Sequence, residues 1–185
     1  MYVFRRINDS DIKFKFKTGN EIFDEFAPDG SLQNYIKQDI AKGGHFFTYL
    51  LLEVQKSKSE LLGLLRFRYS SNNEYLEQLS LCKASTDIKR NIKKYLSLKE
   101  YSIIYLSRIG VSEKFHEMRV SQIISNFFEF IIQRKRKDII IYAKILEDLT
   151  SVVGSKYKII GRNKDKKWGK YFLVSKIMEF NPKTE

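Results

Sequence analysis

Residues suited to phosphate binding lie together in the stretch from Tyr101 to Arg136. A β-branched and aromatic run over residues 102–111 predicts a buried strand, and a polar turn follows over residues 112–119. From Val120 onward, apolar residues recur at three- and four-residue spacing, which predicts an amphipathic helix. A strand that leads through a loop into a helix directs backbone N–H groups and the positive end of the helix dipole to one point. We expect a phosphate-bearing ligand there.

The composition limits the class of protein. With 185 residues, 43% of them hydrophobic, the chain can bury a real core, and we expect one domain. There are 34 Lys and Arg against 22 Asp and Glu, a net charge of +12, so polyanions such as nucleic acid, a phosphorylated cofactor or an acidic surface are candidate partners. The alternative is a solvated basic surface without a partner, and the charge alone does not choose between them.

Cysteine and histidine are scarce, and this excludes several kinds of site. Cys82 is the single cysteine, which rules out an intrachain disulfide framework, and with two histidines we expect no structural metal. The N-terminal residues lack the apolar core of a signal peptide, and no run approaches the roughly 20 apolar residues of a membrane span. We therefore expect a cytoplasmic protein.

Outside the central stretch, the hydrophobic pattern predicts further strands and helices. In chain order we expect a strand at 2–7, a short strand or extended lead-in at 12–16, helices at 21–26 and 31–41, an antiparallel hairpin of 45–55 and 60–69, a strand at 138–143, a helix at 146–153, and a strand pair of 157–160 and 170–174 around 161–169. Residues 70–100 have the weakest pattern. Leu76 and Leu79 indicate a helix there, whereas Asp87 to Tyr95 is a basic segment with little to bury.

This order of elements resembles the GNAT superfamily of acyl-CoA-dependent N-acetyltransferases. The run from Leu106 to Phe115, LSRIGVSEKF, is similar to the family's central strand and the start of its pyrophosphate loop. Gly63 is similar to a glycine that the family often carries in its third strand, and the run from Thr18 to Phe26 resembles the opening of toxin-type GNAT enzymes, which acetylate charged tRNA. The resemblance implies an α/β (α+β) fold with a mixed, mostly antiparallel central sheet flanked by helices. It covers residues 1–185 as a single domain, with 70–100 as a candidate insertion.

The resemblance also implies a site for acetyl-CoA. In the family, the pantetheine arm bonds to the backbone of the central strand, which maps to Ile109, Gly110 and Val111. The pyrophosphate loop reads Gln or Arg, two variable residues, Gly, one variable residue, then Gly or Ala. Those positions are His116, Glu117, Met118, Arg119, Val120 and Ser121.

Arg119 therefore stands where the family has its first loop glycine. Its guanidinium either adds a phosphate contact or fills space that a glycine leaves open.

The catalytic residues are less well marked. The family often uses a tyrosine to protonate the CoA thiolate, but that position falls on Val152. Ser151, Thr150 and Tyr157 are substitute candidates, while Glu53 and Glu113 are candidate bases that would deprotonate the amine.

Two functions follow from the sequence. The first is transfer of an acetyl group from acetyl-CoA to a primary amine by direct attack. The second is a catalytically inactive GNAT-fold module that binds nucleic acid or an acidic protein. Trp168, surrounded by lysines, either stacks on a base while the lysines meet phosphates or belongs to a charged turn in which its ring folds back on the sheet. The acceptor and the oligomeric state have no signal in the sequence.

Overall fold

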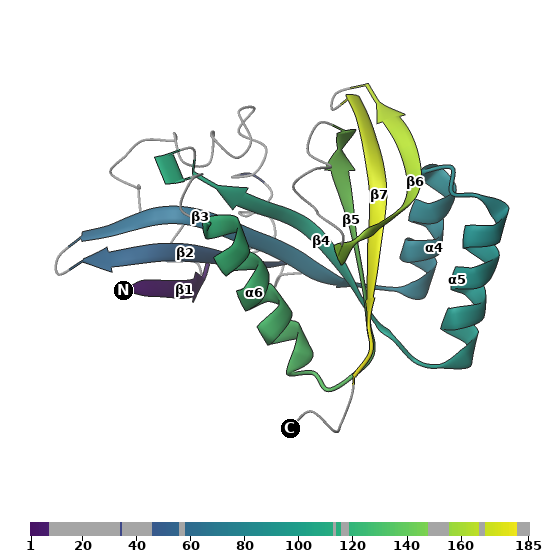
Figure 1. The fold of residues 1–185 in the computed structure, drawn as a ribbon, viewed down its shortest axis with the longest axis horizontal. Coiled ribbons are helices and arrows are strands. Elements are labelled where there is room, and N and C mark those ends of the chain that lie inside the picture. Colours follow the sequence, from purple (N-terminus) through teal and green to yellow (C-terminus); the bar gives the residue numbers. More distant parts are fainter. Residues whose placement is uncertain are drawn as a thin grey trace. The chain divides into compact units, whose positions relative to one another are not determined.

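The computed structural model describes residues 1–7, 34, 46–55, 58–112, 114–115, 119–147, 156–166 and 169–180; for 58, 59 and 165 it describes the backbone alone. Its elements are β1 (Tyr2–Arg6), β2 (Phe47–Gln55), β3 (Lys58–Ser70), α4 (Asn72–Leu81), α5 (Thr86–Leu98), β4 (Ser102–Val111), α6 (Val120–Gln133), β5 (Ile139–Leu146), β6 (Lys158–Asp165) and β7 (Gly169–Met178) (Figure 1).

The strands form one seven-stranded sheet in the order β1-β2-β3-β4-β5-β7-β6. The pairs β1–β2, β2–β3, β5–β7 and β6–β7 are antiparallel, and β4–β5 is parallel. The same chain also forms the helices α4, α5 and α6 (Figure 1). The predicted fold class, a mixed and mostly antiparallel sheet flanked by helices, is therefore confirmed.

The chain divides into two compact units. The first comprises Met1–Arg68 and Arg108–Arg134, and the second comprises Tyr69–Ser107 and Lys135–Glu185. Each unit holds its own described core.

The core of the first unit joins the β2–β3 hairpin to α6. The hairpin is antiparallel, as predicted, with Phe47 opposite Phe67. Aromatic rings meet the helix: Phe127 stacks on Phe4 with ring centroids 3.7 Å apart, and Phe128 lies 5.1 Å from Phe67. The predicted helix is therefore confirmed, but its apolar stripe is shifted. The buried residues of α6 are Val120, Ile124, Phe128 and Ile132, whereas Ile123, Phe127 and Ile131 of the predicted stripe are only partly buried.

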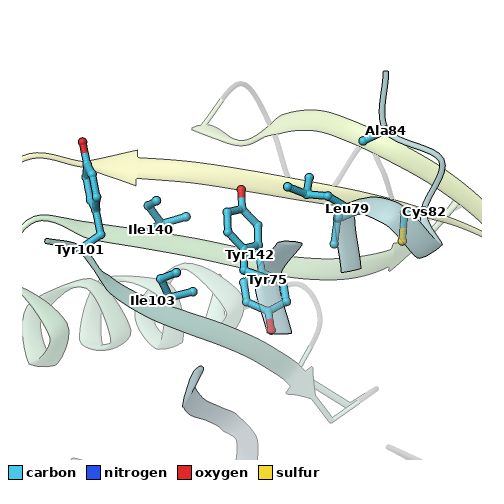
Figure 2. Packing of buried hydrophobic residues seen from close by; sticks show 9 residues of the cluster. Tyr75, Leu79, Cys82, Ala84, Tyr101, Ile103, Ile140 and Tyr142 are labelled. Atoms are coloured by element: carbon cyan, nitrogen blue, oxygen red, sulfur yellow. The ribbon is translucent and has the colours of Figure 1, made fainter. Parts of the chain in front are cut away.

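The core of the second unit joins α4 and α5 to β4, β5 and β7. Tyr75, Leu79 and Cys82 are buried with Tyr142 of β5, and Figure 2 shows these side chains gathered together. The Tyr75 hydroxyl donates to Ser175 Oγ at 2.9 Å, and Ser175 Oγ in turn donates to the carbonyl of Ile141 at 3.0 Å. This buried pair of hydrogen bonds ties α4 to β7 and β5.

The weakly patterned segment 70–100 contains two helices. The expected helix is α4, whose N-terminus carries a capping box: Glu74 N–H donates to Ser71 Oγ, and Ser71 N–H donates to the Glu74 carboxylate. The basic segment was expected to have little to bury, but it forms α5. Ile88, Ile92 and Leu96 recur every four residues and pack against the core of the second unit.

The C-terminal strands are longer than expected. Residues 161–169 were expected to be the connection of a hairpin, but β6 continues to Asp165 and β7 begins at Gly169. A bulge between Ile159 and Gly161 shifts the register, and beyond it the two strands stay paired from Gly161 opposite Leu173 to Asp165 opposite Gly169.

The helix expected at 146–153 is corrected at its start, since Leu146 still belongs to β5. Its residues from 148 lie outside the described part of the chain.

The expectations for 12–16, 21–26 and 31–41 also lie outside the described residues, except that Asn34 is helical and exposed.

Candidate functional site

The second half of β4 is the accessible part of that strand. Leu106 is buried, whereas all five residues that follow it are partly exposed. β4 pairs in parallel with β5 as far as Leu106, which lies opposite Ala143, and β4 then continues to Val111. The residues predicted to meet the pantetheine arm lie in this accessible half: Ile109, Gly110 and Val111.

Gly63 allows β3, β4 and α6 to approach one another closely. A Cβ atom at position 63 would lie 2.5 Å from the Gly110 carbonyl oxygen and 2.8 Å from Ile124 Cδ1. The first contact is with backbone, which cannot rotate away as a side chain can. Gly63, the glycine that carries part of the family resemblance, thus has a physical role: it lets β3 pack closely against the end of β4 and against α6.

The turn after β4 is tied back to β3. Ser112 N–H donates to the carbonyl of Leu62 at 2.9 Å, and Phe115 N–H donates to the carbonyl of Ser112 at 2.8 Å. The Phe115 side chain is buried. Lys114 Nζ donates to the Glu60 carboxylate of β3. These contacts hold the start of the loop in place, and the Glu60–Lys114 pair is one that sequence reasoning missed.

Arg119 has the backbone conformation of a glycine position. Its φ is 53° and its ψ is 25°, in the left-handed region, where a side chain other than that of Gly, Asn or Asp is disfavoured by about 1–2 kcal/mol. The family pattern puts its first loop glycine at this residue. The loop therefore turns into α6 with the geometry of the glycine, although an exposed arginine occupies the position.

The first turn of α6 is open to an anion. The Arg119 carbonyl accepts from Gln122 N–H at 3.0 Å and Ile123 N–H at 3.2 Å, the Arg119 side chain makes no capping hydrogen bond, and the first turn carries no acidic residue. Val120 is buried and Ser121 is exposed. The leading N–H groups of a helix carry partial positive charge, so this turn attracts a phosphate.

The predicted cofactor residues that the structure describes occur in one strand–turn–helix of the first unit. They are Ile109, Gly110, Val111, Arg119, Val120 and Ser121. His116, Glu117 and Met118 lie outside the described residues, as does Glu113, so their assignments stay predictions.

The catalytic candidates are not brought to one described site. Glu53 lies on β2, opposite Tyr2 of β1 and Glu60 of β3. Tyr157 belongs to the second unit, just before β6, and is partly buried. Ser151, Thr150 and Val152 lie outside the described residues. Glu60 lies opposite Glu53 in the observed register. The sequence did not indicate this, because a connection over residues 56–59 would set Gln55 opposite Glu60.

The described residues show neither of two other features, a metal-binding cluster and a membrane-spanning helix. No group of three or more histidine, cysteine, aspartate or glutamate side chains is placed to hold a metal ion in that part of the chain. None of the described helices has the length and apolar character needed to cross a membrane.

At the level of sequence, the chain matches no protein-family model, and no curated protein is similar to it. Similarity appears in three dimensions. Arabidopsis thaliana NAA60 in complex with acetyl-CoA matches with a TM-score of 0.60 at 15% identity, covering 96% of this chain and 99% of that one.

Bacterial structures match in the same way. A putative acetyltransferase of the GNAT family from Desulfovibrio desulfuricans has a TM-score of 0.60 at 8% identity, covering 98% and 100% of the two chains. The ribosomal-protein-S18-alanine N-acetyltransferase from Escherichia coli has a TM-score of 0.58 at 5% identity, covering 100% of this chain and 99% of that one. The chain therefore has the fold of the GNAT acetyltransferases, as its sequence predicted.

Proposed function

We propose that this protein is an acyl-CoA-dependent N-acetyltransferase, which transfers an acetyl group from acetyl-CoA to a primary amine by direct attack. The main support is the left-handed backbone at Arg119, between an accessible strand end and a helix whose first turn carries no acidic residue. A similar structure, that of NAA60, contains acetyl-CoA. The same proposal places the protein in the cytoplasm, which agrees with the free thiol of the buried Cys82.

In this proposal the cofactor binds along β4 and at the start of α6. The pantetheine arm hydrogen-bonds to the backbone of Ile109–Val111, and the pyrophosphate accepts from N–H groups at Val120 and Ser121 and from the loop residues His116, Glu117 and Met118. The exposed Arg119 guanidinium adds a charged contact to the phosphates. An anionic phosphate binds best where no negative charge repels it, and the first turn of α6 carries no acidic residue.

The reaction needs no covalent enzyme intermediate. A neutral amine nitrogen attacks the thioester carbonyl, the new C–N bond forms as the C–S bond breaks, and the departing CoA thiolate takes up a proton. Backbone N–H groups of β4 polarise the carbonyl, and a carboxylate or water removes the proton from the amine. Glu53 is a candidate base, and Tyr157 and Ser151 are candidate acids; each stays a prediction.

A second candidate function is a GNAT-fold module that binds a partner but does not catalyse. One observation favours it: a full arginine side chain occupies the position at which the family has glycine. If that side chain fills the phosphate site, the fold is retained while the cofactor is excluded.

Calorimetric titration with acetyl-CoA separates the two functions. At moderate salt, which suppresses nonspecific binding to the basic surface, saturable binding at one site supports the enzyme, and absence of binding supports the module. A screen of primary amines with detection of free CoA thiol then tests catalysis. Binding without turnover of any amine would leave the module as the function.

Variants of Arg119 test its role directly. Arg119→Ala weakens acetyl-CoA binding if the guanidinium contacts phosphate, whereas Arg119→Gly strengthens it if the side chain obstructs the loop. Arg134→Ala is a matched control, because Arg134 lies at the other end of the same helix. Unchanged affinity in both Arg119 variants would remove this residue from the site.

A further inference from the structure

The cations on the described helices are unevenly distributed. Among α4, α5 and α6, lysine and arginine occur on α5 alone, which carries Lys89, Arg90, Lys93 and Lys94. The neighbouring α4 has the opposite sign, with Glu74 and Glu77 and no cation.

The four cations share one side of α5. Ile88, Ile92 and Leu96 pack against the core of the second unit. At about 100° per residue, the cations span roughly 140° of the helix circumference, from the partly buried Lys89 beside Leu96 round to Lys94, in two rows with Cβ atoms about 5–6 Å apart. Arg90, Lys93 and Lys94 are exposed. This basic side faces solvent, since the core of the unit lies on the other side of the helix.

The one acidic residue of α5 does not neutralise this side. Asp87 pairs with Arg90 at 3.4 Å, but the two side chains are 82% and 73% exposed. Exposed pairs of this kind contribute about 0–1 kcal/mol, so Arg90 can exchange Asp87 for a phosphate at little cost. The helix is otherwise secured by its Ser85 N-cap, whose hydroxyl accepts from Ile88 N–H.

We infer that the outer side of α5 binds the phosphate backbone of a nucleic acid. Two rows of cations suit a phosphodiester chain, whose charges repeat along its length. An anionic membrane fits less well, because an interfacial helix inserts its apolar face, and here that face is packed in the protein core. The inference is independent of acetyl transfer.

Two variants with the same loss of charge test the inference. One carries Arg90→Gln, Lys93→Gln and Lys94→Gln on α5, and the other carries Lys158→Gln, Lys164→Gln and Lys166→Gln near the end of the sheet formed by β6. Glutamine keeps a high helix propensity, and circular dichroism with thermal unfolding checks that both variants fold. Fluorescence anisotropy then measures binding of a labelled 20-nucleotide single-stranded RNA at several salt concentrations.

The α5 variant should bind this RNA on the order of 10- to 100-fold more weakly at 0.15 M salt, and the slope of log K against log salt should become shallower by about 2. The β6 variant should stay within about threefold of the wild type, because few of its lost charges would meet the strand.

Several outcomes would overturn the inference. Equal losses in the two triple variants would mean a general charge effect, and a larger loss in the β6 variant would place the surface at the β6–β7 hairpin near Trp168. Tighter binding to phosphatidylserine vesicles or to a polyglutamate peptide than to the RNA would assign the surface to a membrane or to an acidic protein. A folded wild type that binds none of these probes would leave α5 without a polyanion partner.

Discussion

At the scale of single residues, the structure requires glycine for two different reasons, close packing at some positions and an unusual backbone conformation at another. Gly63 lies against the Gly110 carbonyl and Ile124, and Gly161 lies against Cys82, whose carbonyl oxygen would be 2.6 Å from an added Cβ. Gly169 has a φ of +77° but no heavy atom within 4 Å of an added Cβ. The first two positions need glycine for space, and the third needs it for conformation.

We predict that Gly63→Ala lowers the free energy of unfolding by about 1–3 kcal/mol, since the backbone oxygen of Gly110 must move to admit the methyl group. Urea unfolding followed by circular dichroism measures this change. Gly169→Ala is the control for strain without a clash and should cost about 1 kcal/mol. A cost at Gly63 no larger than at Gly169 would refute the close-packing argument.

The same substitution bears on the candidate site. Displacement of β4 at Gly110 would shift the backbone proposed to hold pantetheine. Gly63→Ala should therefore weaken acetyl-CoA binding even when all of the variant protein is folded. Titration at a temperature where the variant is fully folded makes this comparison. Affinity equal to that of the wild type would separate Gly63 from the cofactor site.

At the scale of elements, one carboxylate links three segments of the second unit. Asp138, just before β5, accepts from Lys99 Nζ at 2.7 Å and from Phe180 N–H at 2.8 Å. Lys99 is the C-cap residue of α5, and Phe180 follows β7. The hydrogen bond from Lys99, and then that from Phe180, lowers the pKa of Asp138, and the same pair raises the pKa of Lys99.

This pair predicts a stability change in acid. Because the pKa of Asp138 is lower in the folded protein than its ordinary 3.8, its stabilising contribution is present above pH 3.8 and is lost as the pH falls through the folded value. Asp138→Asn should remove that part of the pH dependence and cost about 0.5–1 kcal/mol at pH 7. Chemical unfolding between pH 2.5 and 7, with Asp87→Asn as the exposed control, makes the measurement. A variant with an unchanged acid profile would exclude Asp138 as its source.

At the scale of the whole molecule, two buried groups should limit stability in alkali. Burial raises the pKa of Tyr75 from 10.0 to about 12, and burial also raises the pKa of the Cys82 thiol above its ordinary 9.0. Both groups stay neutral in the folded protein at a pH at which the unfolded chain loses their protons. The unfolding free energy should therefore fall as the pH rises past 9, and more steeply past 10.

Tyr75→Phe tests this expectation. It should cost about 1 kcal/mol at pH 7, through loss of the hydrogen bond to Ser175. Between pH 10 and 12 it should remove up to about 1.4 kcal/mol per pH unit of the decline. Tyr95→Phe is the matched control, since Tyr95 is half exposed. If Tyr75→Phe and Tyr95→Phe change the alkaline profile equally, the decline has another cause.

Local pattern alone was enough to predict the strand–turn–helix at the candidate site. The run of β4 is β-branched and aromatic, and the spacing from Val120 to Ile132 follows a helix, so propensity and burial agree there. The β2–β3 hairpin was predictable for the same reason. The sequence by itself therefore determined the order of these elements and the placement of Ile109–Val111, Arg119, Val120 and Ser121 along them.

The tertiary structure decided what depends on partners distant in sequence. The stripe of Ile88, Ile92 and Leu96 is too sparse among lysines to predict α5, and it becomes a helix face because a buried cluster from α4 and β5 covers it. Likewise, β6 continues past Gly161 because the Cys82 carbonyl accepts Arg162 N–H at 2.6 Å, a contact between residues 80 positions apart. Such contacts have no signature in a local window, whereas buried strands and amphipathic helices carry theirs in every few residues.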